Sequence, residues 1–251
     1  MTTVVVGAAQ GIGAGIARRL ATEEWTSRLV LADLKLDGCR ELAAELDTDG
    51  LGVEAIAVDV TDAAQVEDLV GATAEAQRVV IASGAFAPAP ALEVERDEFA
   101  RIQSVNLVGA FFVAQAYART MAEHGSGAIV GVASIAARMP RMRQAAYCAS
   151  KAGLRQALRV LGMEVAPLGV RVNTVSPGPT DTPMMRALAA DHASVDDLAD
   201  GSIDAMRPRI PNGRVARPDD VANVVSFLLA PSSEHVFLQD IVVDGGELLG
   251  M

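Results

Sequence analysis

The sequence predicts an α/β fold with a parallel sheet, and two observations lead to that prediction. Short runs rich in Val, Ile and Leu alternate with longer segments in which apolar residues recur at helical spacing, such as Ile16 and Leu20. Hydrophobic residues make up 51% of the 251 positions and charged residues 21%, which suits a sheet that helices bury on both faces. This alternation is typical of βαβ units, whose strands run parallel.

Seven apolar runs are the expected strands. They are Thr3–Val6, Leu29–Ala32, Val53–Val58, Val79–Ala82, Ala128–Ala133, Arg171–Ser176 and Ile241–Val243. No linker, repeat or low-complexity tract divides the chain, so we expect a single domain over residues 1–251. The least patterned stretch, Pro177 to Pro218, predicts a substrate lid at about residues 179–217, beside the carboxyl ends of the strands.

Charge and composition argue against several classes of partner. The net charge of −11 repels the phosphate backbone of nucleic acids. Cys39 and Cys148 lack metal-ligand or disulfide spacing and the three histidines are scattered, so we expect no metal site. The longest apolar stretch, near Leu107 to Ala118, is shorter than the roughly 20 residues that span a bilayer, and no signal peptide is visible. We therefore expect a soluble cytoplasmic protein, with no membrane or nucleic-acid partner.

A glycine-rich turn follows the first expected strand, at Gly7-Ala8-Ala9-Gln10-Gly11-Ile12-Gly13. Such glycines let backbone N–H groups approach a pyrophosphate at a helix N-terminus, where the helix dipole favours negative charge. The simpler interpretation is a strand-to-helix turn that needs positive φ. Asp33, followed by Leu34, ends the second strand; a carboxylate there accepts hydrogen bonds from an adenosine ribose and repels a 2′-phosphate. Together these features predict NAD as cofactor, although Asp33 alone is also typical of a solvated acid.

Asp59-Val60 ends the third expected strand and is a second candidate for contact with the adenosine. The carboxylate of Asp59 can meet the adenine amino group. Alone, Asp59 would more often be a helix N-cap for a segment that begins at Thr61 or Asp62.

Tyr147 and Lys151 are the candidate catalytic pair. They lie four positions apart, which on a helix places both side chains on one face. A lysine ammonium stabilises phenolate and lowers the pKa of a phenol from about 10 toward the range of a general base. Ser134, at the end of a strand, can hydrogen-bond the same substrate oxygen. A partly exposed helix pair is the alternative, but the glycine loop and Ser134 favour an enzyme.

The sequence resembles the short-chain dehydrogenase/reductase family over essentially its whole length. The resemblance rests on Gly7-x-x-x-Gly11-x-Gly13, Asp59-Val60, Asn106 in Val105-Asn106-Leu107, Ser134, Tyr147-x-x-x-Lys151 and Asn173-x-Val175-x-Pro177-Gly178-x-Thr180. It implies a doubly wound, mostly parallel, Rossmann-like sheet of about seven strands with helices on both faces. It also implies hydride transfer to nicotinamide and a proton relay from Tyr147 through ribose, Lys151 and a water held by Asn106.

The same resemblance implies further contacts with the cofactor and with other subunits. The carboxamide side of the cofactor would be braced by Pro177-Gly178 and Thr180. The cofactor would also contact the backbone of Ala82, Ser83 and Gly84. The family usually has Asn-Asn-Ala-Gly where this chain has Ile81-Ala82-Ser83-Gly84, and Thr where it has Val6, so two asparagine side chains are missing. Family members are usually tetramers or dimers, so we expect a homo-oligomer.

A closer resemblance covers the second half of the chain. The matching segments are Ala136-Ala137-Arg138-Met139-Pro140-Arg141, Ser176-Pro177-Gly178-Pro179-Thr180-Asp181-Thr182, Arg209 to Pro218 and Leu238 to Gly246. They are similar to the 2,3-dihydro-2,3-dihydroxybenzoate dehydrogenases of catechol siderophore pathways. This implies NAD-dependent oxidation of the C3 alcohol of a cyclohexadiene carboxylate, followed by tautomerisation to an aromatic ring.

A ring carboxylate needs a cation, and Arg141 is the first candidate because its planar fork suits bidentate pairing. Arg138 and Arg143 are the runners-up, and a solvated loop is the structural alternative for all three. Met184 and Met185 at the start of the lid would cover the unsaturated ring, unless they form lid core.

Several alternatives stay open. Trans-2,3-dihydro-3-hydroxyanthranilate carries an amine at C2 in place of the hydroxyl group, and Gln144 is a possible reader of that position. A ketoreductase of another alcohol or carbonyl would prefer NADP and would not depend on Arg141. A cofactor-sensing regulator would not need Tyr147.

Overall fold

A computed structural model describes residues 1–47, 50–188 and 194–250 of the chain. Its centre is a seven-stranded parallel sheet with the order β3-β2-β1-β4-β5-β6-β7. The strands are β1 (Thr2–Val6), β2 (Arg28–Asp33), β3 (Gly52–Ala57), β4 (Arg78–Ile81), β5 (Gly127–Val132), β6 (Val170–Pro177) and β7 (Asp240–Val243). Every predicted strand is confirmed, and each end lies within one residue of its predicted position.

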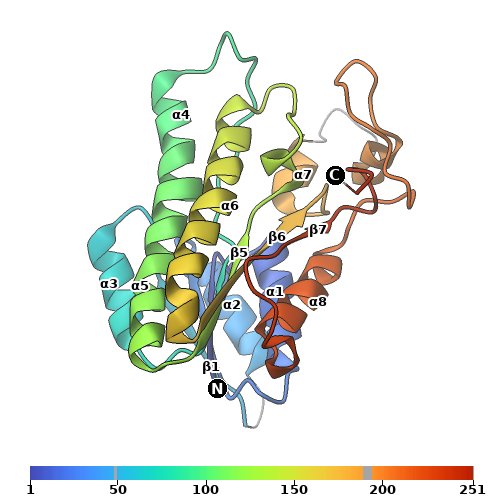
Figure 1. Cartoon of the computed structure of the whole chain (residues 1–251). Helices are drawn as coiled ribbons and strands as arrows, with labels where there is room; N and C mark the ends of the chain where they lie inside the picture. The colour runs from blue at the N-terminus through green and yellow to red at the C-terminus, as the bar shows by residue number, and fades with distance from the viewer. Residues whose placement is uncertain (48–49, 189–193, 251) are drawn as a thin grey trace.

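Helices cover both faces of the sheet (Figure 1). The α-helices are α1 (Gly11–Ala21), α2 (Leu36–Leu46), α3 (Ala63–Ala72), α4 (Arg96–Gln103), α5 (Ala110–Glu123), α6 (Ala145–Val165), α7 (Pro183–Leu188) and α8 (Pro218–Leu229). Shorter helical turns are η1 (Ser104–Gly109), η2 (Ile135–Ala137), η3 (Ala166–Leu168), η4 (Val195–Asp200) and η5 (Pro231–Ser233). None of these helices is long and apolar enough to cross a membrane.

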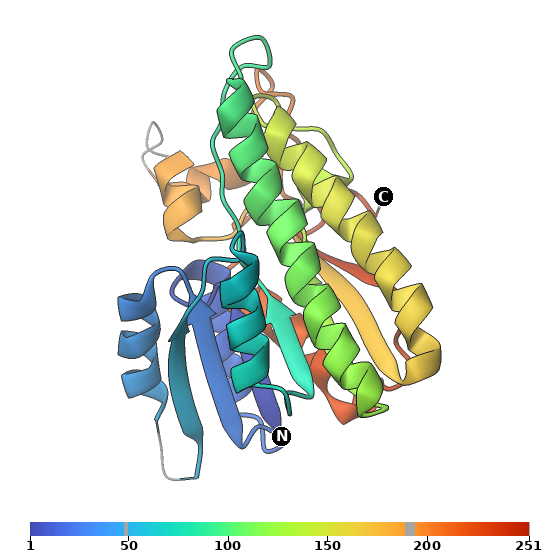
Figure 2. The ribbon, with the colours of Figure 1, turned by 90° about the vertical axis from the view of Figure 1, so that its left-hand side faces the viewer.

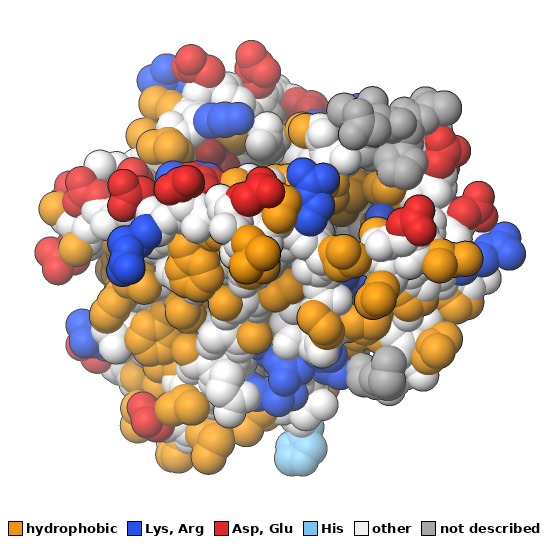
Figure 3. Space-filling view, turned by 90° about the horizontal axis from the view of Figure 1, so that it is seen from above, with side chains coloured by type: hydrophobic (Ala, Val, Ile, Leu, Met, Phe, Trp, Pro, Cys, Tyr) orange, Lys and Arg blue, Asp and Glu red, His pale blue; other side chains and the backbone are white. Residues whose placement is uncertain are grey.

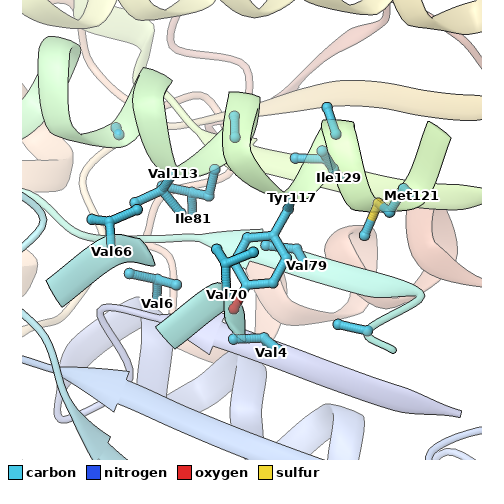
Figure 4. Packing of buried hydrophobic residues seen from close by; sticks show 14 of the residues in the cluster. Val4, Val6, Val66, Val70, Val79, Ile81, Val113, Tyr117, Met121 and Ile129 are labelled. Atoms are coloured by element: carbon cyan, nitrogen blue, oxygen red, sulfur yellow. The ribbon is translucent and has the colours of Figure 1, made fainter. Parts of the chain in front are cut away.

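Alternate residues along the strands build two hydrophobic cores, because successive side chains of a strand point to opposite faces. Val4 and Val6 pack with residues of α3, α5 and α6, whereas Val5 packs with residues of α1, α2 and α8. Figure 4 shows the first core, in which the ring of Tyr117 from α5 lies beside Val70 and Val79. The Tyr117 hydroxyl group is 2.7 Å from the Thr73 hydroxyl, so this tyrosine has a structural partner.

The strand order reverses direction beside β1, and this determines where a ligand can bind. From β1 the chain builds β2 and β3 on one side and then crosses to build β4 to β7 on the other. Loops that leave β1 and β4 therefore diverge and leave a crevice at the carboxyl ends of the strands. In Figure 2 the segment that carries α7 (orange) lies above these ends.

The segment predicted as a lid has a small core of its own. Leu198, Ala199, Ile210 and Val215 are buried together, and Met185 packs against them. A parallel bridge between Thr180 and Ala216 joins the two ends of the segment. Residues 189–193, which the predicted lid includes, lie outside the described residues.

Candidate active site

A cavity of about 590 Å³ opens at the carboxyl edge of the sheet. Figure 3, seen from this end, shows hydrophobic side chains across much of the surface with charged side chains among them. The cavity brings together almost all of the candidate residues that the sequence predicts. Those that line it are Gly7, Gln10, Gly11, Ile12, Gly13, Asp33, Leu34, Asp59, Val60, Ala82, Ser83, Gly84, Ser134, Arg141, Gln144, Tyr147, Lys151, Pro177, Gly178, Thr180, Met184 and Met185.

The turn between β1 and α1 fits a dinucleotide. Gly7 has a φ of +88°, and a Cβ atom on Gly13 would lie 1.9 Å from the Gly7 carbonyl oxygen. Gln10 precedes α1 without a side-chain cap, and no acidic residue stands in the first turn. The N–H groups of that turn therefore face the cavity with a positive dipole end, which suits a pyrophosphate.

Asp33 fastens the glycine loop to the end of β2. One of its carboxylate oxygens accepts a hydrogen bond from Ala9 N at 3.1 Å, and the other accepts one from Lys35 N at 2.9 Å. Each oxygen keeps a free lone pair for a further donor. The carboxylate is thus held at the cavity wall in a position from which it can accept hydrogen bonds from a ribose.

Asp59 lies at the same wall but does not cap the following helix. Its Oδ1 accepts hydrogen bonds from Thr61 N at 2.9 Å and Thr61 Oγ1 at 2.7 Å. The N-cap of α3 is Asp62, which accepts from Ala64 N at 2.9 Å and Gln65 N at 3.3 Å. Asp59 Oδ2 stays available at the cavity.

Ser134 and Tyr147 face each other across the cavity floor. Ser134 caps η2, and its hydroxyl oxygen accepts a hydrogen bond from Ala136 N at 3.1 Å. Burial raises the pKa of Tyr147 above its ordinary value, and a hydrogen bond with Ser134 opposes that rise. Desolvation disfavours the charged phenolate, whereas a hydrogen-bond donor or a cation beside the phenol oxygen favours it.

Lys151 lies beside Tyr147 in the cavity. Its Nζ donates a hydrogen bond to the Val132 carbonyl oxygen at 2.9 Å and lies 5.9 Å from the centre of the Tyr147 ring. Burial lowers the pKa of Lys151 from 10.5 to about 8. The ammonium therefore stays mostly charged at pH 7, loses its proton near pH 8, and is oriented toward the backbone of β5.

The pKa of Lys151 leads to a prediction about stability. A lysine whose pKa is about 8 when folded and 10.5 when unfolded destabilises the fold by ~3 kcal/mol below pH 8, and this penalty fades as the pH rises through 10.5. Lys151→Met should therefore raise the free energy of unfolding above that of the native chain, and this increase should be about 2–3 kcal/mol larger at pH 7 than at pH 10. The difference corresponds to roughly 4–12 °C in melting temperature. Lys35→Met, at the other lysine of the chain, is exposed and is the control. Equal gains at both values of pH would show that Lys151 is not buried as a cation.

Asn106 lies behind the cavity and holds its wall in place. Its Oδ1 accepts a hydrogen bond from Ala85 N at 2.6 Å, and its Nδ2 donates to Ala85 O at 2.9 Å and to Ser150 Oγ at 3.1 Å. Both amide hydrogens are thus used by the protein. Asn106 is fully buried, and in this structure it positions the segment after β4 against α6.

A π-helical turn, η1, places Asn106, and no motif in the sequence predicts this turn. A Cβ atom on Gly109, at the end of η1, would lie 2.5 Å from the Val60 carbonyl oxygen, so the turn packs tightly on the segment after β3. The widened turn lets Asn106 point toward Ala85. π-turns of this kind are often found at functional sites.

The three arginines that the sequence predicts as partners of a substrate carboxylate occupy different places in the structure. Arg138 Nη2 pairs with Asp240 at 2.7 Å, and Arg143 has a φ of +64° while its carbonyl oxygen accepts a hydrogen bond from Ala89 N. Among the described residues, Arg141 is the one of the three that lines the cavity. Its Nη2 donates to Glu247 Oε1 at 2.7 Å, so it is a paired cation rather than a free one.

Phe86 and Arg207 are among the cavity residues that the sequence did not predict. The Phe86 ring stands edge-on to the Tyr147 ring, with 5.0 Å between their centres. Phe86 lies two positions after Gly84, so its place after β4 was a usable signal. Arg207 also lines the cavity, but it comes from the lid, and no spacing in the sequence connects it with Tyr147.

Known proteins resemble the chain throughout its length. A family model described as "Enoyl-(Acyl carrier protein) reductase" matches residues 7–247. The 2,3-dihydro-2,3-dihydroxybenzoate dehydrogenase of Bacillus subtilis is 33% identical over 98% of this chain and 95% of its own length. The D-threitol dehydrogenase of Mycolicibacterium smegmatis is 38% identical over 97% of this chain and 91% of its own length.

A solved structure agrees with the sequence comparisons. An actinorhodin polyketide ketoreductase variant with NADPH is 31% identical, with a TM-score of 0.87 over 98% of this chain and 96% of the other. The parallel sheet, the glycine turn and the cluster of Ser134, Tyr147 and Lys151 are consistent with these relatives. The chain belongs to the short-chain dehydrogenase/reductase family of oxidoreductases, which use a nicotinamide cofactor.

Proposed function

We propose that the chain oxidises the C3 alcohol of a trans-2,3-dihydro-3-hydroxy cyclohexadiene carboxylate to an aromatic acid, with NAD as the oxidant. The favoured substrate is 2,3-dihydro-2,3-dihydroxybenzoate. One observation carries the proposal: the catalytic side chains Ser134 and Tyr147 share a cavity with Arg141, whose side chain is only 8% exposed. A buried guanidinium beside a proton-accepting pair suits a substrate that has both an alcohol and a carboxylate.

Each catalytic residue of the cavity has its own role in the oxidation of the alcohol. Ser134 donates a hydrogen bond to the alcohol oxygen and holds it, and Tyr147 accepts the hydroxyl proton. Lys151 lies beside Tyr147 and stabilises the phenolate that takes part. The nicotinamide ring, when bound, supplies the acceptor for the hydride from carbon 3. The resulting ketone loses a ring proton and gains one on oxygen, which yields the phenol of the aromatic product.

The amide group of Asn106 supports this arrangement from outside the cavity. Because it fixes Ala85 and Ser150, it keeps the segment after β4 next to the helix that carries Tyr147 and Lys151. Ala82, Ser83 and Gly84 then present backbone to the cofactor. A Cβ atom on Gly7 would lie 2.4 Å from Ser83 N, so the two cofactor-facing turns fit closely without the missing asparagines.

NAD is the proposed cofactor because of Asp33, which would face the 2′-phosphate of NADP with a like charge. Asp33→Ala should raise the NADP-to-NAD ratio of kcat/KM about tenfold or more, since a repulsion of ~1.4 kcal/mol or greater is removed. Asp33→Asn removes the same charge and keeps an oxygen for the Ala9 or Lys35 N–H, so it should shift the ratio with less loss of melting temperature. An unchanged ratio in both variants would place the discrimination elsewhere.

Two further features belong to the proposal. The segment at about residues 179–217 closes over the substrate as a lid, with Met184 and Met185 at its start lining the cavity. The chain forms a homo-oligomer, a dimer or tetramer, which is supported by exposed apolar side chains along η1, α5 and α6. These are Val108, Phe112, Val160 and Met163.

Two other substrates are the alternatives. The 2-amino analogue, trans-2,3-dihydro-3-hydroxyanthranilate, has the same carboxylate and alcohol, and Gln144 at the cavity wall could contact its C2 substituent. A sugar alcohol such as threitol is favoured by the likeness to D-threitol dehydrogenase.

A substrate panel tests the proposal. The purified chain is given 2,3-dihydro-2,3-dihydroxybenzoate, its 2-amino analogue, the same diene diol without the carboxylate, and threitol, with NAD and NADP in separate reactions. Reduced cofactor should form fastest from one of the two acids with NAD. For the diene diol without the carboxylate, kcat/KM should be at least tenfold lower, because one charge-assisted pair is lost. A higher kcat/KM for threitol than for both acids would overturn the assignment.

A further inference from the structure

A buried ionic cluster lies at one wall of the cavity and joins three distant parts of the chain. Arg141 precedes α6, Arg207 belongs to the predicted lid, and Glu247 follows β7. Arg141 Nη2 lies 2.7 Å from Glu247 Oε1, and Arg207 Nε lies 3.9 Å from the same oxygen. One carboxylate oxygen is therefore shared by two guanidinium groups.

The burial of the cluster shows that it is not a surface ion pair. The Glu247 side chain is 0% exposed, Arg141 8% and Arg207 17%. Arg141 and Arg207 line the cavity, and among the described residues Glu247 does not. The two cations thus belong to residues of the cavity wall, whereas the anion that pairs with them does not.

The hydrogen bonds of the cluster are incomplete. Within the described part of the chain, no partner exists for Arg141 Nη1, Arg207 Nε or Glu247 Oε2, although all three atoms are buried. Buried polar atoms without partners are costly, and an anion bound at the cavity wall would supply an acceptor for the two guanidinium groups. Arg207 Nη2 donates to the Leu198 carbonyl oxygen, which holds the arginine to the lid.

A second cluster in the same protein has a carboxylate with both oxygens occupied, although Arg155 Nε in it also lacks a hydrogen-bond partner. Asp240 also lies between two arginines, Arg138 and Arg155, which both reach its Oδ2. Its Oδ1 accepts hydrogen bonds from Thr174 at 3.0 Å and Ser176 at 2.6 Å. Both oxygens of Asp240 are thus occupied, whereas one oxygen of Glu247 is not.

We infer that Arg141 and Arg207 together bind the carboxylate of the substrate, and that Glu247 positions both guanidinium groups and cancels one of their two charges. This inference rests on the proposed function for the identity of the carboxylate. The subsite then carries a net charge of one, which matches a singly charged anion. A doubly charged anion would leave one buried negative charge without compensation, and burying an unpaired charge is unfavourable.

The pKa values agree with this arrangement. Burial raises the pKa of Glu247, and the charges of Arg141 and Arg207 act against the rise. Burial lowers the pKa of Arg207, and Glu247 acts against that change. Each charge in the cluster therefore depends on the others, and an incoming carboxylate adds a second anion for the two cations.

Binding of simple aromatic ligands tests the inference without turnover. Isothermal titration calorimetry of the NADH-saturated chain at neutral pH would use benzoate as the monoanion, phthalate as the dianion and catechol as the neutral probe. Arg207→Met should weaken benzoate binding at least tenfold and change catechol binding less than twofold. Arg209→Met removes an exposed charge two positions away, where the side chain is 71% exposed, and should leave both affinities unchanged. Unchanged benzoate binding in Arg207→Met would overturn the inference.

Glu247→Gln tests the charge balance. The amide keeps an oxygen for Arg141 while the net charge of the subsite rises to two, so the affinity ratio of phthalate to benzoate should rise at least tenfold. Glu45→Gln, which removes a surface carboxylate paired with Arg18, should leave the ratio unchanged. If Arg207→Met does not fold, Arg207→Lys keeps the charge and loses the planar fork, and benzoate should bind at least threefold more weakly. An unchanged ratio in Glu247→Gln, or unchanged benzoate binding in Arg207→Lys, would contradict the inference.

The outcomes also separate this inference from the proposed function. The probes have no alcohol to oxidise, so loss of benzoate binding in Arg207→Met supports the subsite even if neither dihydro acid is turned over. If a dihydro acid is oxidised and Arg207→Met leaves its kcat/KM unchanged, the two-arginine subsite alone is wrong.

Discussion

Replacing Tyr147 with Phe should lower kcat for alcohol oxidation by roughly 10²–10⁴, the usual contribution of a positioned general base. The change removes the phenol oxygen that accepts the substrate proton and keeps the ring, so the edge-on contact with Phe86 at 5.0 Å is retained. Cofactor affinity, measured by the fluorescence of bound NADH, should change less than twofold. Steady-state rates with the best substrate of the panel give kcat directly.

The second tyrosine of the chain provides the matched control. Tyr117→Phe also removes one phenol oxygen, but this hydroxyl is buried in the core and bonded to Thr73. It should lower the free energy of unfolding by about 1 kcal/mol and leave kcat unchanged. A Tyr147→Phe enzyme that keeps more than a tenth of the native kcat would remove Tyr147 from the reaction.

Gly13→Ala should have the largest effect on the cofactor turn. The added Cβ atom would lie 1.9 Å from the Gly7 carbonyl oxygen, and both groups belong to backbone that the strand and helix hold in place. We expect a loss of about 3 kcal/mol in the free energy of unfolding, or roughly 6–12 °C in melting temperature. NAD affinity should fall at least tenfold, because the turn must open at the point where the pyrophosphate binds.

Gly71→Ala is the control for the loss of a glycine. Gly71 lies in α3, and a Cβ atom there would meet nothing within 4 Å. In a helix interior, alanine is favoured over glycine by roughly 0.5–1 kcal/mol, so this variant should be slightly more stable and should bind NAD normally. If Gly13→Ala is also stable and binds NAD normally, the close approach of Gly13 to the Gly7 carbonyl oxygen is not needed for folding or for cofactor binding.

The sequence predicted the sheet because its strands leave a local signal. A buried parallel strand is a short apolar run bounded by turns, as Thr2–Val6 and Val170–Pro177 illustrate. These two runs are buried along their whole length, whereas the edge strands β3 and β7 are only partly buried. The glycine turn and the pair Tyr147 and Lys151 were predictable for a similar reason, since their spacing fixes their geometry within one turn or one helix.

Other features depend on contacts that sequence spacing does not encode. Lys151 donates to Val132, 19 positions away, and burial lowers its pKa, and neither effect follows from its spacing to Tyr147. Arg141 was predicted at the substrate site, but its partner Glu247 is 106 positions away and carries no motif. The π-turn that places Asn106 ends at Gly109, which packs closely on Val60, a contact that only the folded chain reveals.

We propose that one cavity couples oxidation of a ring alcohol to aromatisation beside a bound carboxylate. The most direct test is to measure aromatic acid by chromatography and reduced cofactor by absorbance in the same reaction, with 2,3-dihydro-2,3-dihydroxybenzoate and NAD. We predict equal molar amounts of the two products at every time point, both lost together in Tyr147→Phe. Reduced cofactor without aromatic acid, or no reduced cofactor from this substrate or its 2-amino analogue, would contradict the claim.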